Sequence, residues 1–428
     1  MSDASRPMAR KGMLPVGVLA AALIALLAIA PFASAASDPL ASGKTTMTLQ
    51  KSFTNYLKTF GISVSKISPA KLSGGKATFN VTGGSLDPTT GKGTVNLSGG
   101  LKFKAGKKSA TVKALVLNTE KKTLTGKVGG KKVKIASIAG WSSTRSGFGA
   151  NLTIKKVKLT NAGATQLNKA TGYAKGKPKP FLGNKLIAKA TSETQPATVT
   201  VLPVGNMTFV GSPVLLTKLK NVEVKLQTLG LTQQTAPTTF TGPILGGTVS
   251  PLGTAGVVQS GIGIKLVQNL PLQVGAITTN ITLGGMYVDL AAKTATVEVI
   301  AESNAESPTG SGKKPLNLGN LGRSSIADIT VTGVNADPTT RTVAISAAGV
   351  LQPVSAEVLQ GFVSVFKAYA EGGAYQKTFE KLKGEGKTDE EADAGGKAAA
   401  KAAGEEVAKN QISAGEALGT FAFTAQAQ

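Results

Sequence analysis

Apolar and polar residues alternate along two neighbouring runs near the start of the chain. In residues 76–104, Phe79 and Val81 are flanked by polar residues, and a second alternating run follows. This period of two is typical of strands that are buried on one face. Residues 87–91, Asp-Pro-Thr-Thr-Gly, separate the runs and favour a tight turn, because proline presets φ and aspartate accepts backbone hydrogen bonds. The stretch therefore predicts a β-hairpin.

The same pattern recurs 163 residues further along the chain. Ile244, Gly246, Gly247, Val249, Pro251, Gly256 and Val258 match Val81, Gly83, Gly84, Leu86, Pro88, Gly93 and Val95 in register. An internal repeat of this length predicts two tandem domains of one fold. We therefore expect an all-β protein with a few short helices, built from two β-sandwich-like domains at 46–195 and 196–428.

Helical spacing interrupts the strand pattern in a few places. Residues 46–60 carry apolar side chains three and four apart, which predicts one amphipathic helix that Gly61 ends, after a short leader at 36–44. A second helix, capped by Thr160 or Asn161, is expected at 160–170, followed by a closing strand at 182–190. The Ala/Glu/Lys-rich insertion at about 371–415 is expected to be either a solvated helical excursion or disordered.

The first 35 residues resemble an export signal. A basic stretch precedes an apolar run from 14 to 30, and Ala33-Ser34-Ala35 provides a small-x-small cleavage site. This order predicts a secretory signal peptide cleaved between Ala35 and Ala36. The alternative is an uncleaved anchor helix, since the run is nearly long enough to span a bilayer. We expect a secreted, extracellular or cell-wall-associated protein.

The absence of two residue types limits the chemistry of the chain. It contains no cysteine, which excludes disulfides and thiolate sites, and no histidine, which excludes the usual Ser/His/Asp triad and histidine-bound metals. No nucleophile and base stand at an interpretable spacing, so we expect no enzyme.

Positive charge is concentrated in the first repeat. Residues 36–200 carry 28 Lys or Arg and 4 Asp or Glu, whereas residues 201–428 carry 17 and 18. An exported domain this basic is attracted to anionic cell-wall polymer or a membrane surface. The export signal and the lack of aromatic residues among the lysines argue against nucleic acid. Alternatively, the lysines keep exposed strands soluble.

Several short motifs follow one another in an order that resembles a known family. They are an SF-x-x-Y helix at 52–56, a GG-x-L-x-P hairpin at 83–88, a G-x-V-x-x-S-G-G-L-K-F strand at 93–103, an L-T-x-x-G-A-x-x-L-N helix at 159–168 and a closing F-L-G strand. This succession resembles the HtaA domain of actinobacterial surface proteins of haem uptake. The resemblance covers about 46–190 well and 198–425 more loosely.

The resemblance implies exported β-sandwich-like domains with two short helices that bind haem through a tyrosine phenolate. Tyr56 stands at the position of that ligand, on one helix face with Phe53, and Phe103 ends the strand that precedes the family's Gly-His pair. Here residues 103–107 end in Gly106-Lys107 and contain no histidine. Lys107 or Lys108 is expected to favour the phenolate or to pair with the haem carboxylates. Tyr173 is expected to face the same pocket.

Two functions remain open on the sequence alone. In the first, the protein binds haem or another planar anionic ligand through Tyr56, as part of haem-iron acquisition with a haem-relay partner protein. In the second, it is a structural or adhesive wall protein that binds anionic polymer. Tyr56 would then be a core tyrosine with its hydroxyl in water.

Overall fold

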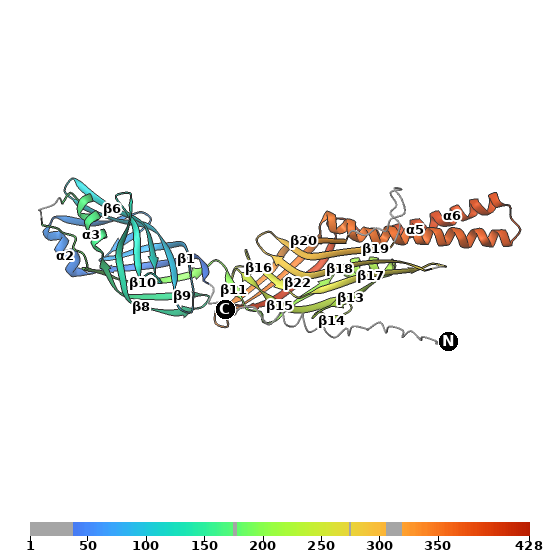
Figure 1. The fold of residues 1–428 in the computed structure, drawn as a ribbon, viewed down its shortest axis with the longest axis horizontal. Helices are drawn as coiled ribbons and strands as arrows, with labels where there is room; N and C mark the ends of the chain where they lie inside the picture. Colours follow the sequence, from blue (N-terminus) through green and yellow to red (C-terminus); the bar gives the residue numbers. More distant parts are fainter. Residues whose placement is uncertain (1–36, 174–177, 274, 305–318) are drawn as a thin grey trace, which may run out of the picture. The chain divides into compact units, whose positions relative to one another are not determined.

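A computed structural model describes residues 37–173, 178–273, 275–304 and 319–428. The predicted signal peptide lies outside these residues. As expected, the described chain is mostly β with a few helices and forms two β domains in tandem, and each domain is built on a closed sheet (Figure 1). Among the described residues, no helix combines the length and the apolar character needed to cross a membrane.

The first sheet closes on itself because β4 pairs with β5 on one side and with β1 on the other. Around the closed path the order is β4, β5, β6, β7, β8, β9, β10 and β1, with β2 beside β5 and β3 beside β4. Its strands are β1 (Asp38–Leu49), β2 (Ile62–Ile67), β3 (Lys71–Ser73), β4 (Lys76–Leu86), β5 (Gly93–Ala105), β6 (Lys108–Asn118), β7 (Thr123–Val128), β8 (Lys131–Ser146), β9 (Gly149–Leu159) and β10 (Leu186–Pro196). Alternate side chains point inward, so opposite walls of the sheet share one core.

The second sheet closes in the same way, because β16 pairs with both β15 and β18. The change of sheet falls between Pro196 and Val199. Its strands are β11 (Val199–Val201), β12 (Asn206–Gly211), β13 (Val224–Leu229), β14 (Gln233–Ala236), β15 (Thr239–Val249), β16 (Val257–Ser260), β17 (Gly263–Pro271), β18 (Ala276–Asp289), β19 (Thr294–Ser303), β20 (Gly319–Asp337), β21 (Thr342–Leu351) and β22 (Ala417–Gln426).

The hairpin predicted from alternation is present in both sheets with the same register. Gly84 lies opposite Val95 in the first sheet, and Gly247 lies opposite Val258 in the second, each just after a bulge. Both glycines have positive φ, and a Cβ would lie 2.2 Å and 2.0 Å, respectively, from a carbonyl oxygen of the paired strand. Only glycine fits there, which explains why the two copies share this residue.

The start of the first sheet differs from the sequence-based expectation. Residues 38–44, expected to be part of the leader, belong to β1, and the expected helix at 46–60 begins only at Lys51, as α2 (Lys51–Thr59). Met47 and Leu49 are buried in the strand. Their spacing fits either structure, and pairing with β4 and β10 selects the strand.

The other helices follow the strand ends. They are α3 (Asn161–Ala170), α4 (Pro213–Asn221), α5 (Pro353–Gly384) and α6 (Asp389–Ala408). As predicted, Thr160 caps α3, and its side chain accepts a hydrogen bond from the N–H of Gly163. The closing strand begins at Leu186, later than expected, because the F-L-G segment forms a loop before it.

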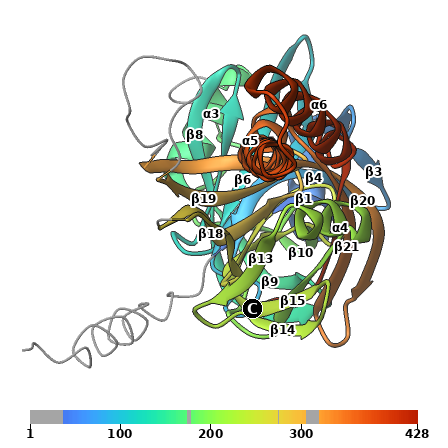
Figure 2. The same ribbon diagram turned by 90° about the vertical axis from the view of Figure 1, so that its right-hand side faces the viewer.

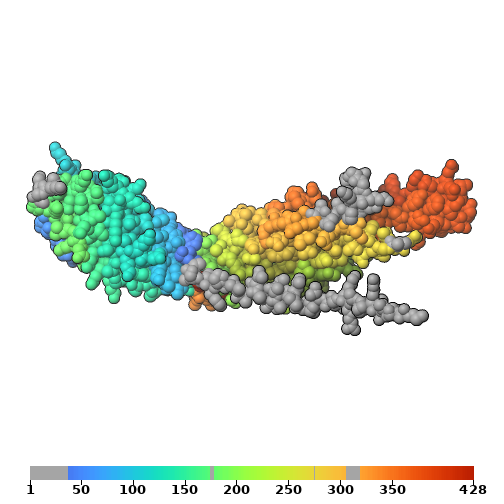
Figure 3. Space-filling view, in the orientation of Figure 1, coloured from blue at the N-terminus to red at the C-terminus, as the bar shows by residue number. Residues whose placement is uncertain are grey.

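The charged insertion is helical. Helices α5 and α6 run side by side and extend beyond the strands of the second sheet (Figures 1 and 3), and Figure 2 shows α5 nearly end-on. Thr388 begins α6 with a capping box to Glu391. Of the two structures considered for this insertion, the helical one is therefore present.

Candidate ligand-binding site

Helix α2 presents Tyr56 at one end of the first sheet. Phe53 and Leu57, four residues apart, are 3% and 0% exposed and anchor the helix in the core. Tyr56 precedes Leu57 and is half-buried. The helix ends before Gly61, whose φ of +66° suits glycine. A rigid helix on a closed sheet therefore holds this phenol near the surface.

Three half-buried aromatic rings lie together beside the end of α2, and we call them the aromatic trio. The rings of Tyr56 and Phe60 meet edge to face with centroids 5.2 Å apart, and those of Phe60 and Tyr173 do so at 5.9 Å. The Tyr173 hydroxyl donates a hydrogen bond to the carbonyl oxygen of Phe60 at 2.9 Å. The structure thus places Tyr173 close to Tyr56, with Phe60 between them.

The two predicted phenylalanines lie deeper than the trio. Phe53 and Phe103 pack against the buried ring of Phe181, at centroid distances of 6.4 Å and 5.4 Å. Asn168 fixes Phe181 through two backbone hydrogen bonds. Phe53 and Phe103 are therefore core residues beneath the site. Apart from the F-L-G motif, nothing in the sequence pointed to Phe181, because its partners are far away along the chain.

A lysine approaches the trio from the turn between β5 and β6. Lys107 is exposed at that turn, whereas the side chain of Lys108 packs over Gly172, next to Tyr173. A Cβ at Gly172 would lie 2.5 Å from the Cδ of Lys108 and 3.3 Å from its Nζ. Lys108 thus places a cation beside Gly172, the residue before Tyr173, where it can meet an anionic group of a ligand.

The second sheet has an equivalent helix without the tyrosine. At the end of α2 the carbonyl of Leu57 accepts a hydrogen bond from the N–H of Phe60, and at the end of α4 the carbonyl of Leu219 accepts the equivalent bond from Val222. Leu219 therefore corresponds to Leu57, and Lys218, one residue earlier, corresponds to Tyr56. The Nζ of Lys218 pairs with a carboxylate oxygen of Glu416 at 2.8 Å. Helix α4 therefore carries an ion-paired lysine where the first sheet has a phenol.

A hollow of about 500 Å³ lies along α2. Thr54, Lys58 and Leu72 are among the residues that line it, and Tyr56 is not. The hollow therefore follows a different face of the helix from the aromatic trio.

The Asp-Pro-Thr-Thr turns are structural. Asp87 and Asp337 accept hydrogen bonds from the N–H groups of Thr89 and Thr339 at 2.8 Å and 2.7 Å. In the part of the chain that the structure describes, no three His, Cys, Asp or Glu residues are grouped to hold a metal ion. The carboxylates of Asp87 and Asp337 therefore stabilise the two turns by accepting backbone hydrogen bonds.

No protein-family model matches the sequence, and no curated protein matches it. Two solved structures are similar in part. The C-terminal domain of HtaA from Corynebacterium glutamicum has 14% identity and a TM-score of 0.28, covering 37% of this chain and 99% of that one. The heme binding protein HtaB from the same organism has 13% identity and a TM-score of 0.30, covering 54% of this chain and 95% of that one.

Proposed function

We propose that the protein is an exported, surface-associated haem-binding protein of the HtaA type, and that Tyr56 is the iron ligand. The observation that best supports this proposal is the position of Tyr56, which is half-buried on α2 within the aromatic trio. A phenolate is a hard anionic donor that suits ferric haem iron. The chain has no histidine or cysteine to compete for that role.

The surroundings of Tyr56 support a planar anionic ligand. The rings of Phe60 and Tyr173 offer apolar contact area, and Lys108 supplies a positive charge beside Gly172 for a propionate. When bound, the haem would supply the iron. The chain would supply the phenolate, the apolar contacts and the cation.

Replacing Tyr56 with phenylalanine is expected to weaken hemin binding by about tenfold or more, because the ring stays and only the donor oxygen is lost. Hemin titration of the mature chain, followed by the Soret band, measures this. Tyr369→Phe, on α5, is the matched control and should bind like the unchanged protein. An unchanged Soret shift in Tyr56→Phe, or no shift in the parent protein, would refute the proposal. Loss in Tyr173→Phe alone would assign the ligand to Tyr173 instead.

A second function, binding of an anionic polymer by the first sheet, is favoured by a row of lysines. Lys127 in β7 lies directly opposite Lys113 in β6 and Lys132 in β8, and all three are exposed. Like charges in directly opposed positions destabilise a sheet. Among residues 37–173 and 178–196, no lysine or arginine forms an ion pair, whereas the ion pairs of the described chain lie from Lys218 onward.

Few carboxylates offset this charge. Residues 36–200 contain four, and burial raises the pKa of one of them, Asp38, to about 6. The lysine row is thus an uncompensated cationic surface that a linear polyanion would neutralise.

Changing Lys113, Lys127 and Lys132 together to glutamine is expected to reduce binding of inorganic polyphosphate at low salt by about tenfold, with a shallower salt dependence. Fluorescence anisotropy of labelled polyphosphate at several NaCl concentrations measures both. The control removes the same charge from exposed lysines of the second sheet and its helices, Lys220, Lys225 and Lys377. Equal losses of polyphosphate binding in the two triple variants would show that only net charge matters. That result would contradict a specific role for the lysine row.

A further inference from the structure

Strand β2 is paired on one side only. Among the described residues its hydrogen-bonded neighbour is β5, where Val64 lies opposite Phe103. Strand β3 is likewise paired only with β4. Every second residue of an antiparallel strand directs its N–H and C=O groups away from its neighbour. One edge of β2 therefore presents backbone groups with which no described strand pairs, and such an edge is a template for another strand.

The hollow along α2 lies against this free edge. Residues 61–64 line it, together with Lys58 on α2, Leu72 in β3 and others. Side chains of a strand alternate between two faces. A hollow that contacts successive residues of β2 therefore follows the backbone edge of the strand and not one of its faces.

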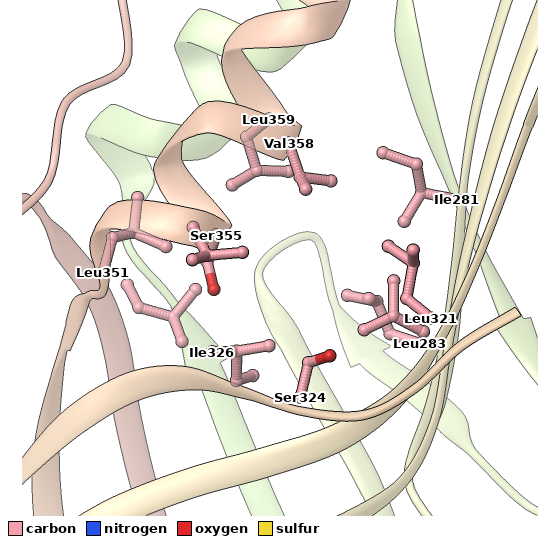
Figure 4. Close-up of a pocket in the computed structure, with 12 residues that line it drawn as sticks. Ile281, Leu283, Leu321, Ser324, Ile326, Leu351, Ser355, Val358 and Leu359 are labelled. Carbon is pink, nitrogen blue, oxygen red and sulfur yellow. The ribbon is translucent and has the colours of Figure 1, made fainter. Parts of the chain in front are cut away.

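The hollow along α2 is large enough for a short extended chain. Its volume of about 500 Å³ is within the range of about 300 to 1,000 Å³ that is typical of ligand sites. By contrast, the apolar hollow beneath the first turns of α5 (Figure 4) has a volume of about 60 Å³. Of these two hollows, the one beside β2 is therefore the candidate for a ligand.

The side chains beside the free edge fit a strand with alternating residues. Val64 and Leu72 are half-buried and pack against the core of the first sheet, whereas Ser63 and Ser65 are exposed. A strand added beside β2 would continue both faces of the sheet. Its apolar residues would lie on the side of Val64, and its polar residues would lie on the side of the two serines.

The free edge is surrounded by positive charge. Lys58, Lys66, Lys71 and Lys76 are exposed, and none of them forms an ion pair within the described parts of the chain. The sequence has no Asp or Glu between residues 39 and 86. This charge attracts an acidic partner, and it repels the same edge of a second copy of this chain.

The second sheet has an equivalent strand, β13, with a different edge. Gly61 and Glu223 directly precede the two strands, both have positive φ, and each donates its N–H to the carbonyl three residues earlier. Position 225 in β13 carries an exposed lysine where β2 has Ser63. Lysine on an edge strand discourages pairing with another strand. The edge of β2 is therefore the more accessible of the two.

We propose that the free edge of β2 binds an extended acidic peptide segment of a partner protein by adding it to the first sheet as a strand. The outward backbone groups of residues 62–65 would form hydrogen bonds with the peptide backbone. Val64 and Leu72 would contact its apolar residues, and Lys58 would meet its carboxylates. Tyr56 does not line the hollow, so this site is separate from the proposed haem ligand.

A fluorescently labelled hexapeptide of alternating glutamate and valine tests the proposal on the full mature chain without hemin. Fluorescence anisotropy at low salt is expected to show saturable binding. The same peptide with an N-methylated backbone keeps its charges and its valines but has no backbone donors. It is expected to bind at least tenfold more weakly, because several hydrogen bonds are lost.

Hydrogen exchange followed by mass spectrometry locates the bound peptide. Exchange is expected to slow in residues 62–67 when the peptide is added, because the outward N–H groups become hydrogen-bonded. Residues 224–229 of β13 are the internal control, and their exchange should not change.

Two variants test the lining of the hollow. Lys58→Glu is expected to weaken peptide binding by about fivefold at low salt, and by less as NaCl is raised. Lys220→Glu, at the corresponding exposed position of α4, is the matched control and should bind the peptide like the parent. Ser63→Trp, at an exposed position, fills part of the hollow and is expected to weaken binding without reversing a charge.

Several results would overturn the proposal. Equal binding of the two peptides would mean that charge alone attracts them, and equal protection of 62–67 and 224–229 would mean that the edge of β2 is not selected. Protection of 62–67 that rises with protein concentration in the absence of peptide would assign the edge to a second copy of the chain. Absence of saturable binding, or equal binding by Lys58→Glu and Lys220→Glu, would also contradict it. Because hemin is left out, none of these outcomes depends on the role of Tyr56.

Discussion

Leucine in place of Asn168 is expected to lower the free energy of unfolding of the first sheet by about 4 kcal/mol. Asn168 is 5% exposed in α3. Its Nδ2 donates to the carbonyl oxygen of Phe181 at 2.8 Å, and its Oδ1 accepts from the N–H of Phe181 at 3.1 Å. Leucine has a similar volume but leaves both backbone groups buried without a partner, at about 1 to 3 kcal/mol each.

The single tryptophan gives this experiment a local reporter. Trp141 lies in β8 and packs against the core of the first sheet, so urea unfolding followed by its fluorescence reports on that sheet. Thr165→Leu, at an exposed position of the same helix, is the control and should cost little. Similar losses in the two variants would contradict the role assigned to Asn168.

The second sheet contains a weaker version of the same contact. The Oε1 of Gln360 in α5 accepts from the N–H of Ile412 at 2.7 Å. Only one backbone group is paired by Gln360, so Gln360→Leu is expected to lower the free energy of unfolding about half as much as Asn168→Leu.

Alanine in place of Gly149 is expected to lower the free energy of unfolding of the first sheet by about 3 kcal/mol or more. A Cβ at this position would lie 1.8 Å from the carbonyl oxygen of Thr194 in β10. Strand β10 cannot move away, because its other side is paired with β1 around the closed sheet. The clash must therefore break hydrogen bonds between β9 and β10.

Gly106→Ala is the comparison for Gly149→Ala. Gly106 has a φ of +54°, and nothing lies within 4 Å of its ideal Cβ, so alanine there costs only backbone strain of about 1 kcal/mol. Both variants are measured by urea unfolding with Trp141 fluorescence. If Gly149→Ala lowers the free energy of unfolding no more than Gly106→Ala does, the contact between β9 and β10 is looser than described.

The hairpins and the caps could be predicted from sequence because their causes are local. Asp87 and Thr160 act on backbone groups a few residues away, and Gly84 is required by its own φ and by the strand beside it. These signals are contained in short windows of sequence, so they can be recognised without knowing the rest of the fold.

The parts that could not be predicted depend on distant pairing. Residues 38–45 form a strand because β4 and β10 lie on either side, although Ser42 and Gly43 are weak strand formers. Tyr56 was recognisable as an aromatic residue on the same face of a predicted helix as Phe53. Its link to Tyr173 through Phe60 depends on a hydrogen bond between residues 113 positions apart.

The two ends of the long helical excursion are joined to each other where β21 ends and β22 begins. The N–H of Leu351 donates to the carbonyl of Glu416, and the N–H of Gly415 donates to the carbonyl of Leu351. The number of residues between these points can therefore vary without changing the second sheet, provided that the first turns of α5, which bury Phe362, and the end of the excursion, which buries Val407 and Ile412, are kept. The outer turns of α5 and α6 are a natural place for the chain to gain or lose whole segments during evolution, or for an engineer to insert a tag, without disturbing the strands.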